Sequence, residues 1–207
     1  FQGVCMHHDL GPLGAAVNLT ALRRQLEILK DMGVNAIRTS HNPPTPELPG
    51  LASEMGILII DEMFDEWKYP KCENGYHTLW DEWAEKDARA LIKRDRNHPS
   101  VILWSLGNEI HEQDKEDGAE ICRILHEISH DEDPTRLTTA GFNNPGAAIR
   151  TDREIPLGPD RVVVVPEGVG YDCLTCAGVR HSWIHFQLPT PIAPEETITT
   201  SRPSRLR

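Results

Sequence analysis

Several features that mark other protein classes are missing from this chain of 207 residues. No apolar run approaches the length that crosses a bilayer, and the formal net charge is −11, so we expect neither a membrane nor a nucleic acid as partner. The sequence also lacks a glycine-rich phosphate loop and a Gly-x-Ser-x-Gly nucleophile elbow. These absences exclude the commonest phosphate-binding and serine-hydrolase chemistries.

An even set of cysteines is also lacking, which argues against a disulfide framework. The five cysteines are spread along a chain that is large enough to fold without cross-links, so we predict mostly free thiols; they are Cys5, Cys72, Cys122, Cys173 and Cys176. A hydrophobic content of 39% suffices for one domain with a sizeable core. The first residues, 1–6, resemble a strand already under way, so we expect the chain to begin inside a larger protein.

Strand and helix signals alternate along the first three quarters of the chain. Short β-branched runs alternate with amphipathic segments, which predicts strands at 3–7, 34–40, 57–62, 101–106 and 136–140, and helices at 20–32, 46–55, 79–96 and 118–129. Thr20 is the expected cap of the first helix, and Pro49-Gly50 should kink or break the second. This order with short connections is typical of a parallel β/α architecture.

Polar side chains gather where the predicted strands end. Glu109 follows the apolar run 101–106, and His7, Arg38, His41, Asn42 and Asp65 follow or close the earlier strands. In a barrel of parallel strands these ends meet on one face, where catalytic groups converge. We therefore interpret Glu109 as a catalytic acid, and we interpret the other side chains, with Asn108 and the aromatic Trp67, as contacts for a neutral polyhydroxyl ligand such as a sugar.

Five motifs follow one another along the chain: Gly3-Val4 with His7, 35–44, Ile60-Asp61-Glu62, 97–101 and 104–109. Over about residues 1–149 they resemble glycoside hydrolase family 2, whose members include β-galactosidases, β-glucuronidases and β-mannosidases. It implies an eight-stranded β/α barrel, of which this chain would supply about the first five strands. It also implies hydrolysis of an oligosaccharide or β-galactoside substrate.

The resemblance assigns roles to single residues. It implies that Glu109 is the general acid/base and that Asn108 hydrogen-bonds the sugar's 2-hydroxyl, while Arg38, His41 and Asn42 shape the sugar subsite. Some family members hold a magnesium ion beside the acid/base, but Lys68 stands where its histidine ligand is expected, so no metal and no cofactor are predicted.

A retaining glycosidase needs a second carboxylate about 5–5.5 Å from the first. The sequence shows no motif of the family's nucleophile; Glu167 and the pair Glu195-Glu196 are the nearest candidates and do not match in context. Composition also changes near residue 150: residues 151–207 hold seven of the sixteen prolines and no lysine. We therefore expect a barrel portion at 1–150 and an irregular tail at 151–207 that is either disordered or foreign to the family, for instance through a change of reading frame.

Each catalytic interpretation has a structural alternative. The histidines could be structural hydrogen-bonding groups, Asp61 and Glu62 could brace Arg38 instead of touching substrate, and Trp67 could be core. Two functions therefore stay open: a β-galactosidase-like retaining glycosidase, or an inactive truncated product or sugar-binding remnant.

Overall fold

The computed structural model describes residues 1–141, 147–150, 154–156 and 172–175. Its main sheet is parallel and its strands follow one another in sequence order; they are β1 (Gly3–His7), β2 (Ala36–Ser40), β3 (Leu58–Glu62), β4 (Val101–Asn108) and β5 (Leu137–Gly141). This order is that of consecutive strands in a β/α barrel, so the predicted partial barrel with five strands is confirmed.

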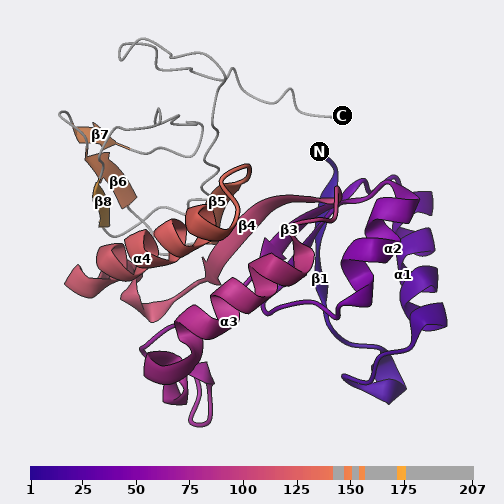
Figure 1. The fold of residues 1–207 in the computed structure, drawn as a ribbon, viewed down its shortest axis with the longest axis horizontal. Helices are drawn as coiled ribbons and strands as arrows, with labels where there is room; N and C mark the ends of the chain where they lie inside the picture. The colour runs from indigo at the N-terminus through magenta and orange to yellow at the C-terminus, as the bar shows by residue number, and fades with distance from the viewer. Residues whose placement is uncertain (142–146, 151–153, 157–171, 176–207) are drawn as a thin grey trace, which may run out of the picture.

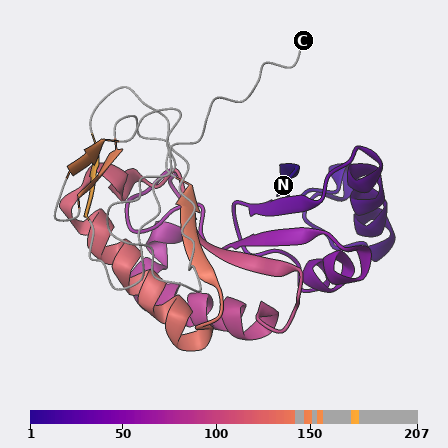
Figure 2. The ribbon, with the colours of Figure 1, turned by 90° about the horizontal axis from the view of Figure 1, so that it is seen from above.

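Helices connect the strands and lie along one side of the sheet (Figures 1 and 2). They are α1 (Leu19–Asp31), α2 (Glu47–Met55), α3 (Trp80–Asp95) and α4 (Glu116–Glu132), with short 3₁₀ turns at Gly11–Leu13, Tyr76–Thr78 and His111–Asp114. The apolar side chains of strands and helices meet between these two layers. Leu26, Ile37, Ile59, Ala88 and Ile92 are at most 1% exposed there, which makes this interface the core.

The cap of α1 lies two residues before the predicted one. Asn18 caps the helix, because its side-chain oxygen accepts a hydrogen bond from the Ala21 N–H at 2.9 Å. Thr20, the expected cap, lies inside the first turn. Both residues are good caps in principle, and Asn18 has the extended backbone that a capping position requires.

The predicted kink in α2 is absent. The helix begins at Glu47, so Pro49 occupies its first turn, where a backbone N–H has no partner within the helix in any case. The helix then runs through Gly50 to Met55 and ends at Gly56, whose φ of 70° suits a left-handed C-terminal cap. The predicted start at residue 46 lies within one residue of the observed one, so the error was to treat Pro49 as a proline in the helix interior.

The other face of the sheet carries the polar side chains and points away from the helices. Alternate residues of neighbouring strands share this face, and the register pairs Cys5 with Arg38 and Glu62 with Ser105. The apolar residues below them, Leu58, Ile60 and Leu103, are only partly buried. This face corresponds to the interior of a barrel, and its polar end is the carboxyl end of the strands.

A second, antiparallel sheet consists of β6 (Ala147–Arg150), β7 (Glu154–Pro156) and β8 (Asp172–Thr175), in the order β7-β6-β8. Two of these short strands belong to the segment 151–207; the rest of that segment lies outside the described residues, and the predicted domain boundary at residue 150 stays a prediction. Cys5 and Cys72 are free thiols, as expected. Nowhere in the described part of the chain does a helix combine the length and apolar character needed to cross a membrane.

Candidate active site

Glu62 is the centre of the polar network at the carboxyl ends of the strands. Its side chain is fully buried, and two strands, β2 with its following loop and β4, supply its partners: Arg38 Nε at 2.7 Å, His41 Nδ1 at 2.8 Å and Ser105 Oγ at 2.5 Å. Both carboxylate oxygens therefore accept hydrogen bonds, as a buried charge requires. The alternative in which Glu62 braces Arg38 is confirmed.

Asp61 takes no part in that brace. It lies on the helix-facing side of β3, fully buried, with Thr39 Oγ1 3.4 Å from its Oδ1 and with Asp95 of α3 as a neighbouring carboxyl group. Burial, and then the proximity of Asp95, raise the pKa of Asp61 well above its ordinary value. Successive residues of a strand face opposite sides, which explains why the two acidic residues have different partners.

Asn108 is held from two sides. Its side-chain oxygen accepts a hydrogen bond from Arg38 Nη2 at 2.8 Å, and its Nδ2 donates to Asp65 Oδ1 at 3.0 Å. The residue is 6% exposed at the end of β4. Arg38 thus bridges Glu62 and Asn108, so the amide predicted to contact a sugar has a fixed orientation.

Glu109 follows directly and is the exposed member of the group. Its φ is 44°, the one positive value outside glycine among the described residues, and its N–H donates to Gly141 O at 2.5 Å. A left-handed backbone is uncommon for a residue with a side chain and clusters at functional sites. The turn projects the carboxyl group away from the core, at the carboxyl end of the sheet.

Asp65 and Glu66 lie in the loop after β3, and the pKa of each carboxyl group is lowered from its ordinary value. Partial burial raises the pKa of Asp65, but hydrogen bonds from Lys71 and Asn108 and the charge of Lys71 outweigh it, so its pKa lies below the ordinary value. Burial likewise raises the pKa of Glu66, but hydrogen bonds from the backbone N–H groups of His77 and Lys71 lower it by more, so the pKa lies below its ordinary value. Neither Lys71 nor Ser105 was predicted; strand register could have found Ser105, which lies opposite Glu62.

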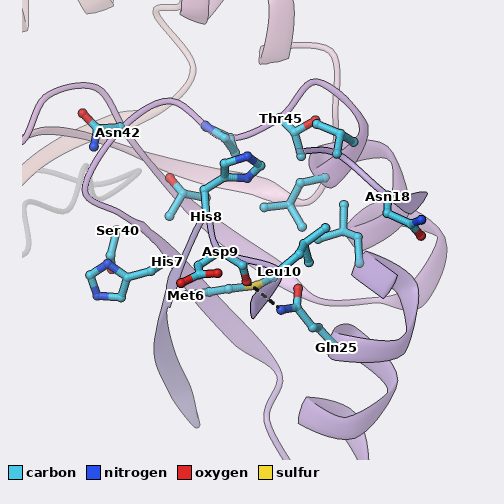
Figure 3. Close-up of a pocket in the computed structure, with 15 residues that line it drawn as sticks. Met6, His7, His8, Asp9, Leu10, Asn18, Gln25, Ser40, Asn42 and Thr45 are labelled. Atoms are coloured by element: carbon cyan, nitrogen blue, oxygen red, sulfur yellow. Dashed lines mark hydrogen bonds between the residues drawn. The ribbon is translucent and has the colours of Figure 1, made fainter. Parts of the chain in front are cut away.

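His7 and His41 complete the predicted set at the ends of β1 and β2. Their rings pack edge to face with centroids 5.0 Å apart, and His7 is exposed. His7 and Asn42 also line a pocket between the loop after β1 and helices α1 and α2, with Asn18 and Gln25 on its opposite side (Figure 3). His8, in the same pocket, contacts Ala15 O at 2.8 Å. This pocket lies beside the network around Asn108 and does not include it.

The prediction that Trp67 contacts the sugar is corrected by the structure. Its side chain is 0% exposed, its Nε1 donates to Leu106 O at 2.9 Å, and its ring packs against Trp80. Trp104 is equally buried and donates its Nε1 to Asp133 Oδ2 at 3.1 Å. Both indoles belong to the core, so neither presents a face on which a sugar could stack.

One sequence motif conflicts with the prediction of no metal. Residues 126–130 read His-Glu-Ile-Ser-His, the spacing of helix-borne zinc ligands. On α4 the rings of His126 and His130 stack with centroids 4.3 Å apart, and His126 Nδ1 lies 2.7 Å from Thr138 Oγ1. Within the described ranges, no group of three or more His, Cys, Asp or Glu side chains is placed to hold an ion. His126 therefore connects α4 with β5 through Thr138.

Comparison with known proteins agrees with this geometry. The family model described as "Glycosyl hydrolases family 2, TIM barrel domain" matches residues 1–154. The chain belongs to glycosyl hydrolase family 2. The motifs that suggested the family lie in the five-stranded sheet and its loops.

Several family 2 proteins are similar to this chain. The β-galactosidase BoGH2A of Bacteroides ovatus is 43% identical over 70% of this chain and 21% of its own length, and a β-glucuronidase of Streptococcus agalactiae is 38% identical over 53% and 20%. A crystal structure of a family 2 member from Bacteroides cellulosilyticus has a TM-score of 0.67 at 44% identity, covering 69% of this chain and 18% of that one. A β-D-glucuronidase structure from Dictyoglomus thermophilum has a TM-score of 0.62 at 31% identity, covering 69% and 26%.

This family 2 chain spans about a fifth of the length of the β-galactosidase BoGH2A. Glu167, Glu195 and Glu196, the residues considered from the sequence for the role of a nucleophile, lie outside the described residues. Glu62 is unsuited to that role, since its buried carboxylate is fully engaged with its three partners.

Proposed function

We propose that the family 2 domain represented by this chain hydrolyses terminal β-glycosidic bonds, with β-galactosides as substrates and with retention of configuration. The observation that carries the proposal is the exposed carboxyl group of Glu109 beside the oriented amide of Asn108 at the carboxyl ends of the strands. Family membership supports the class of reaction, and the relatives named above include both β-galactosidases and β-glucuronidases.

In this mechanism Glu109 donates a proton to the oxygen of the leaving group as the glycosidic bond breaks. A second carboxylate forms the bond to the sugar, and Glu109, now deprotonated, removes a proton from the water that releases the sugar. Asn108 would hydrogen-bond the sugar beside the reacting carbon, because Arg38 and Asp65 fix its amide. His7, His41 and Asn42 would line the rest of the sugar subsite.

The first test is hydrolysis of a β-galactoside with a chromogenic leaving group. We expect turnover by the full chain and its loss in Glu109→Gln, whereas Glu27→Gln, an exposed carboxylate change on α1, should leave it unaltered. Absence of turnover in the wild-type chain would reject the hydrolase proposal for this chain and favour a sugar-binding remnant.

Azide distinguishes the two carboxylate roles. In Glu109→Gly a β-galactosyl azide product would indicate that a separate nucleophile forms the intermediate and that azide attacks it without needing a base. An α-galactosyl azide would mean that azide itself displaces the leaving group in place of a missing nucleophile. That second product would contradict the retaining mechanism for this chain.

A further inference from the structure

The loop between β3 and α3 is fastened to the end of β4 by alternate residues. Three loop residues, each two positions after the last, make one hydrogen bond each to the segment 106–112, which carries Glu109. The pairs are Trp67 Nε1 with Leu106 O at 2.9 Å, Tyr69 N with Glu112 Oε1 at 2.6 Å and Lys71 Nζ with Asn108 O at 2.6 Å. The loop and the turn therefore form one fixed unit.

Lys71 is the member of this unit that reaches the polar network. Besides Asn108 O, its Nζ donates to Asp65 Oδ1 at 2.9 Å, and the same Asp65 oxygen accepts from Asn108 Nδ2 at 3.0 Å. The Lys71 side chain is 19% exposed, so its charge is largely withdrawn from water and paired with Asp65. One ammonium group thus holds the backbone of Asn108 directly and its side chain through Asp65.

The contact with Asn108 O also acts on Glu109. The carbonyl of Asn108 and the N–H of Glu109 belong to one planar peptide group, so fixing one end restricts the other. Lys71 Nζ holds the carbonyl end, and Gly141 O accepts from the N–H end at 2.5 Å. The backbone of Glu109, which follows this peptide group, has a φ of 44°. This left-handed conformation persists only when surrounding contacts support it.

We propose that Lys71 is a positioning residue for the acid/base: its ammonium group fixes the peptide plane from which the Glu109 side chain projects. The catalytic meaning of this role rests on the proposed function, whereas the contacts themselves do not. An ammonium group suits the task because it offers three donors to the two oxygens within its reach, and a neutral side chain would leave Asp65 without a counter-charge.

Amide hydrogen exchange tests the contact without needing activity. The Glu109 amide donates to Gly141 O, so its exchange rate reports whether the plane is held. We expect Lys71→Met to accelerate its exchange at least ~10-fold. The control Lys68→Met, an exposed change three residues earlier in the same loop, should leave the rate within about twofold. The amides of β2 serve as an internal reference.

Kinetics on the β-galactoside test the catalytic consequence. Lys71→Met should lower kcat roughly 10- to 100-fold with KM within about threefold, because misplacement of the acid affects the transition state more than binding. Lys71→Arg, which keeps the charge, should recover part of the loss. Equal kcat losses in Lys71→Met and Lys71→Arg alongside unchanged exchange would overturn the proposal.

The outcomes separate this inference from the proposed function. If the wild-type chain hydrolyses no galactoside, the proposed function fails, and exchange at Glu109 alone decides the role of Lys71. Unchanged exchange at Glu109 in Lys71→Met refutes the positioning role whatever the activity. Acceleration that is equal at Glu109 and in β2 also refutes it, since it would show a general loss of stability.

Discussion

Removal of the Arg38 guanidinium should destabilise the sheet more than loss of a surface ion pair does. In Arg38→Met the aliphatic stem is kept and the charge is lost, leaving the carboxylate of Glu62 buried with two remaining partners, His41 and Ser105. Breaking a buried pair on one side costs about 3–5 kcal/mol. The two remaining partners favour the lower end, so we expect a loss of about 3 kcal/mol in the free energy of unfolding.

The loss of stability in Arg38→Met should depend on the charge of Glu62. Substituting Glu62→Gln in the Arg38→Met background removes the unpaired buried charge and should restore about half of the lost stability, or roughly 1.5 kcal/mol. Urea unfolding followed by the fluorescence of the buried tryptophans measures both values, and a loss of about 3 kcal/mol corresponds to a fall of about 6–12 °C in Tm.

The matched control is Arg23→Met. Arg23 also pairs with a glutamate, Glu54, but their side chains are 45% and 63% exposed, so that pair contributes little. If Arg38→Met costs no more than Arg23→Met, or if the Glu62→Gln change restores nothing, then the buried charge at Glu62 is not what holds Arg38.

Three other predictions follow from single side chains. Burial and Asp95 raise the pKa of Asp61, so the folded protein retains a proton that the unfolded chain releases, and the stability this proton contributes declines as pH rises above the ordinary value of 3.8. Asp61→Asn should therefore gain stability relative to wild type as the pH rises above 3.8 in urea unfolding, and a difference independent of pH would contradict this. Glu109→Gly relieves the left-handed backbone and should raise the free energy of unfolding by about 0.5–1 kcal/mol while abolishing hydrolysis; a destabilised variant would argue against strain there. Trp67→Phe leaves Leu106 O without its donor and should cost about 1–3 kcal/mol, with KM for the galactoside changed less than about twofold; a large rise in KM would restore Trp67 to the sugar site.

Sequence periodicity was sufficient for the five parallel strands and four helices, because each segment has its own strong pattern. It was weaker close to helix starts. Pro49 lies in the first turn of α2 both with the predicted start at residue 46 and with the observed start at Glu47, so the expected kink applied the rule for helix interiors at the wrong position. Similarly, Asn18 and Thr20 are comparable caps in sequence, and the backbone conformation at Asn18 decides between them.

The location of the site at the carboxyl ends of the strands was predictable from the sequence. The hydrogen-bond partner of each polar group was not predictable, because it depends on contacts between distant segments. Lys71 lies in a loop without periodicity, and nothing local shows that its ammonium group reaches Asn108 across 37 positions of sequence. Tryptophan is a residue type on which sugars often stack, so the sequence alone could not place Trp67 in the core. Its burial under neighbouring elements does so.

The three-way engagement of Glu62 constrains how this site can evolve. One carboxylate satisfies Arg38, His41 and Ser105 together, so a substitution at any of these three leaves the same buried oxygens short of a donor. Viable changes at the three positions are then interdependent, and a lineage that replaces Arg38 should also replace Glu62 by a neutral residue. Pairwise substitution across relatives at these positions would record that dependence.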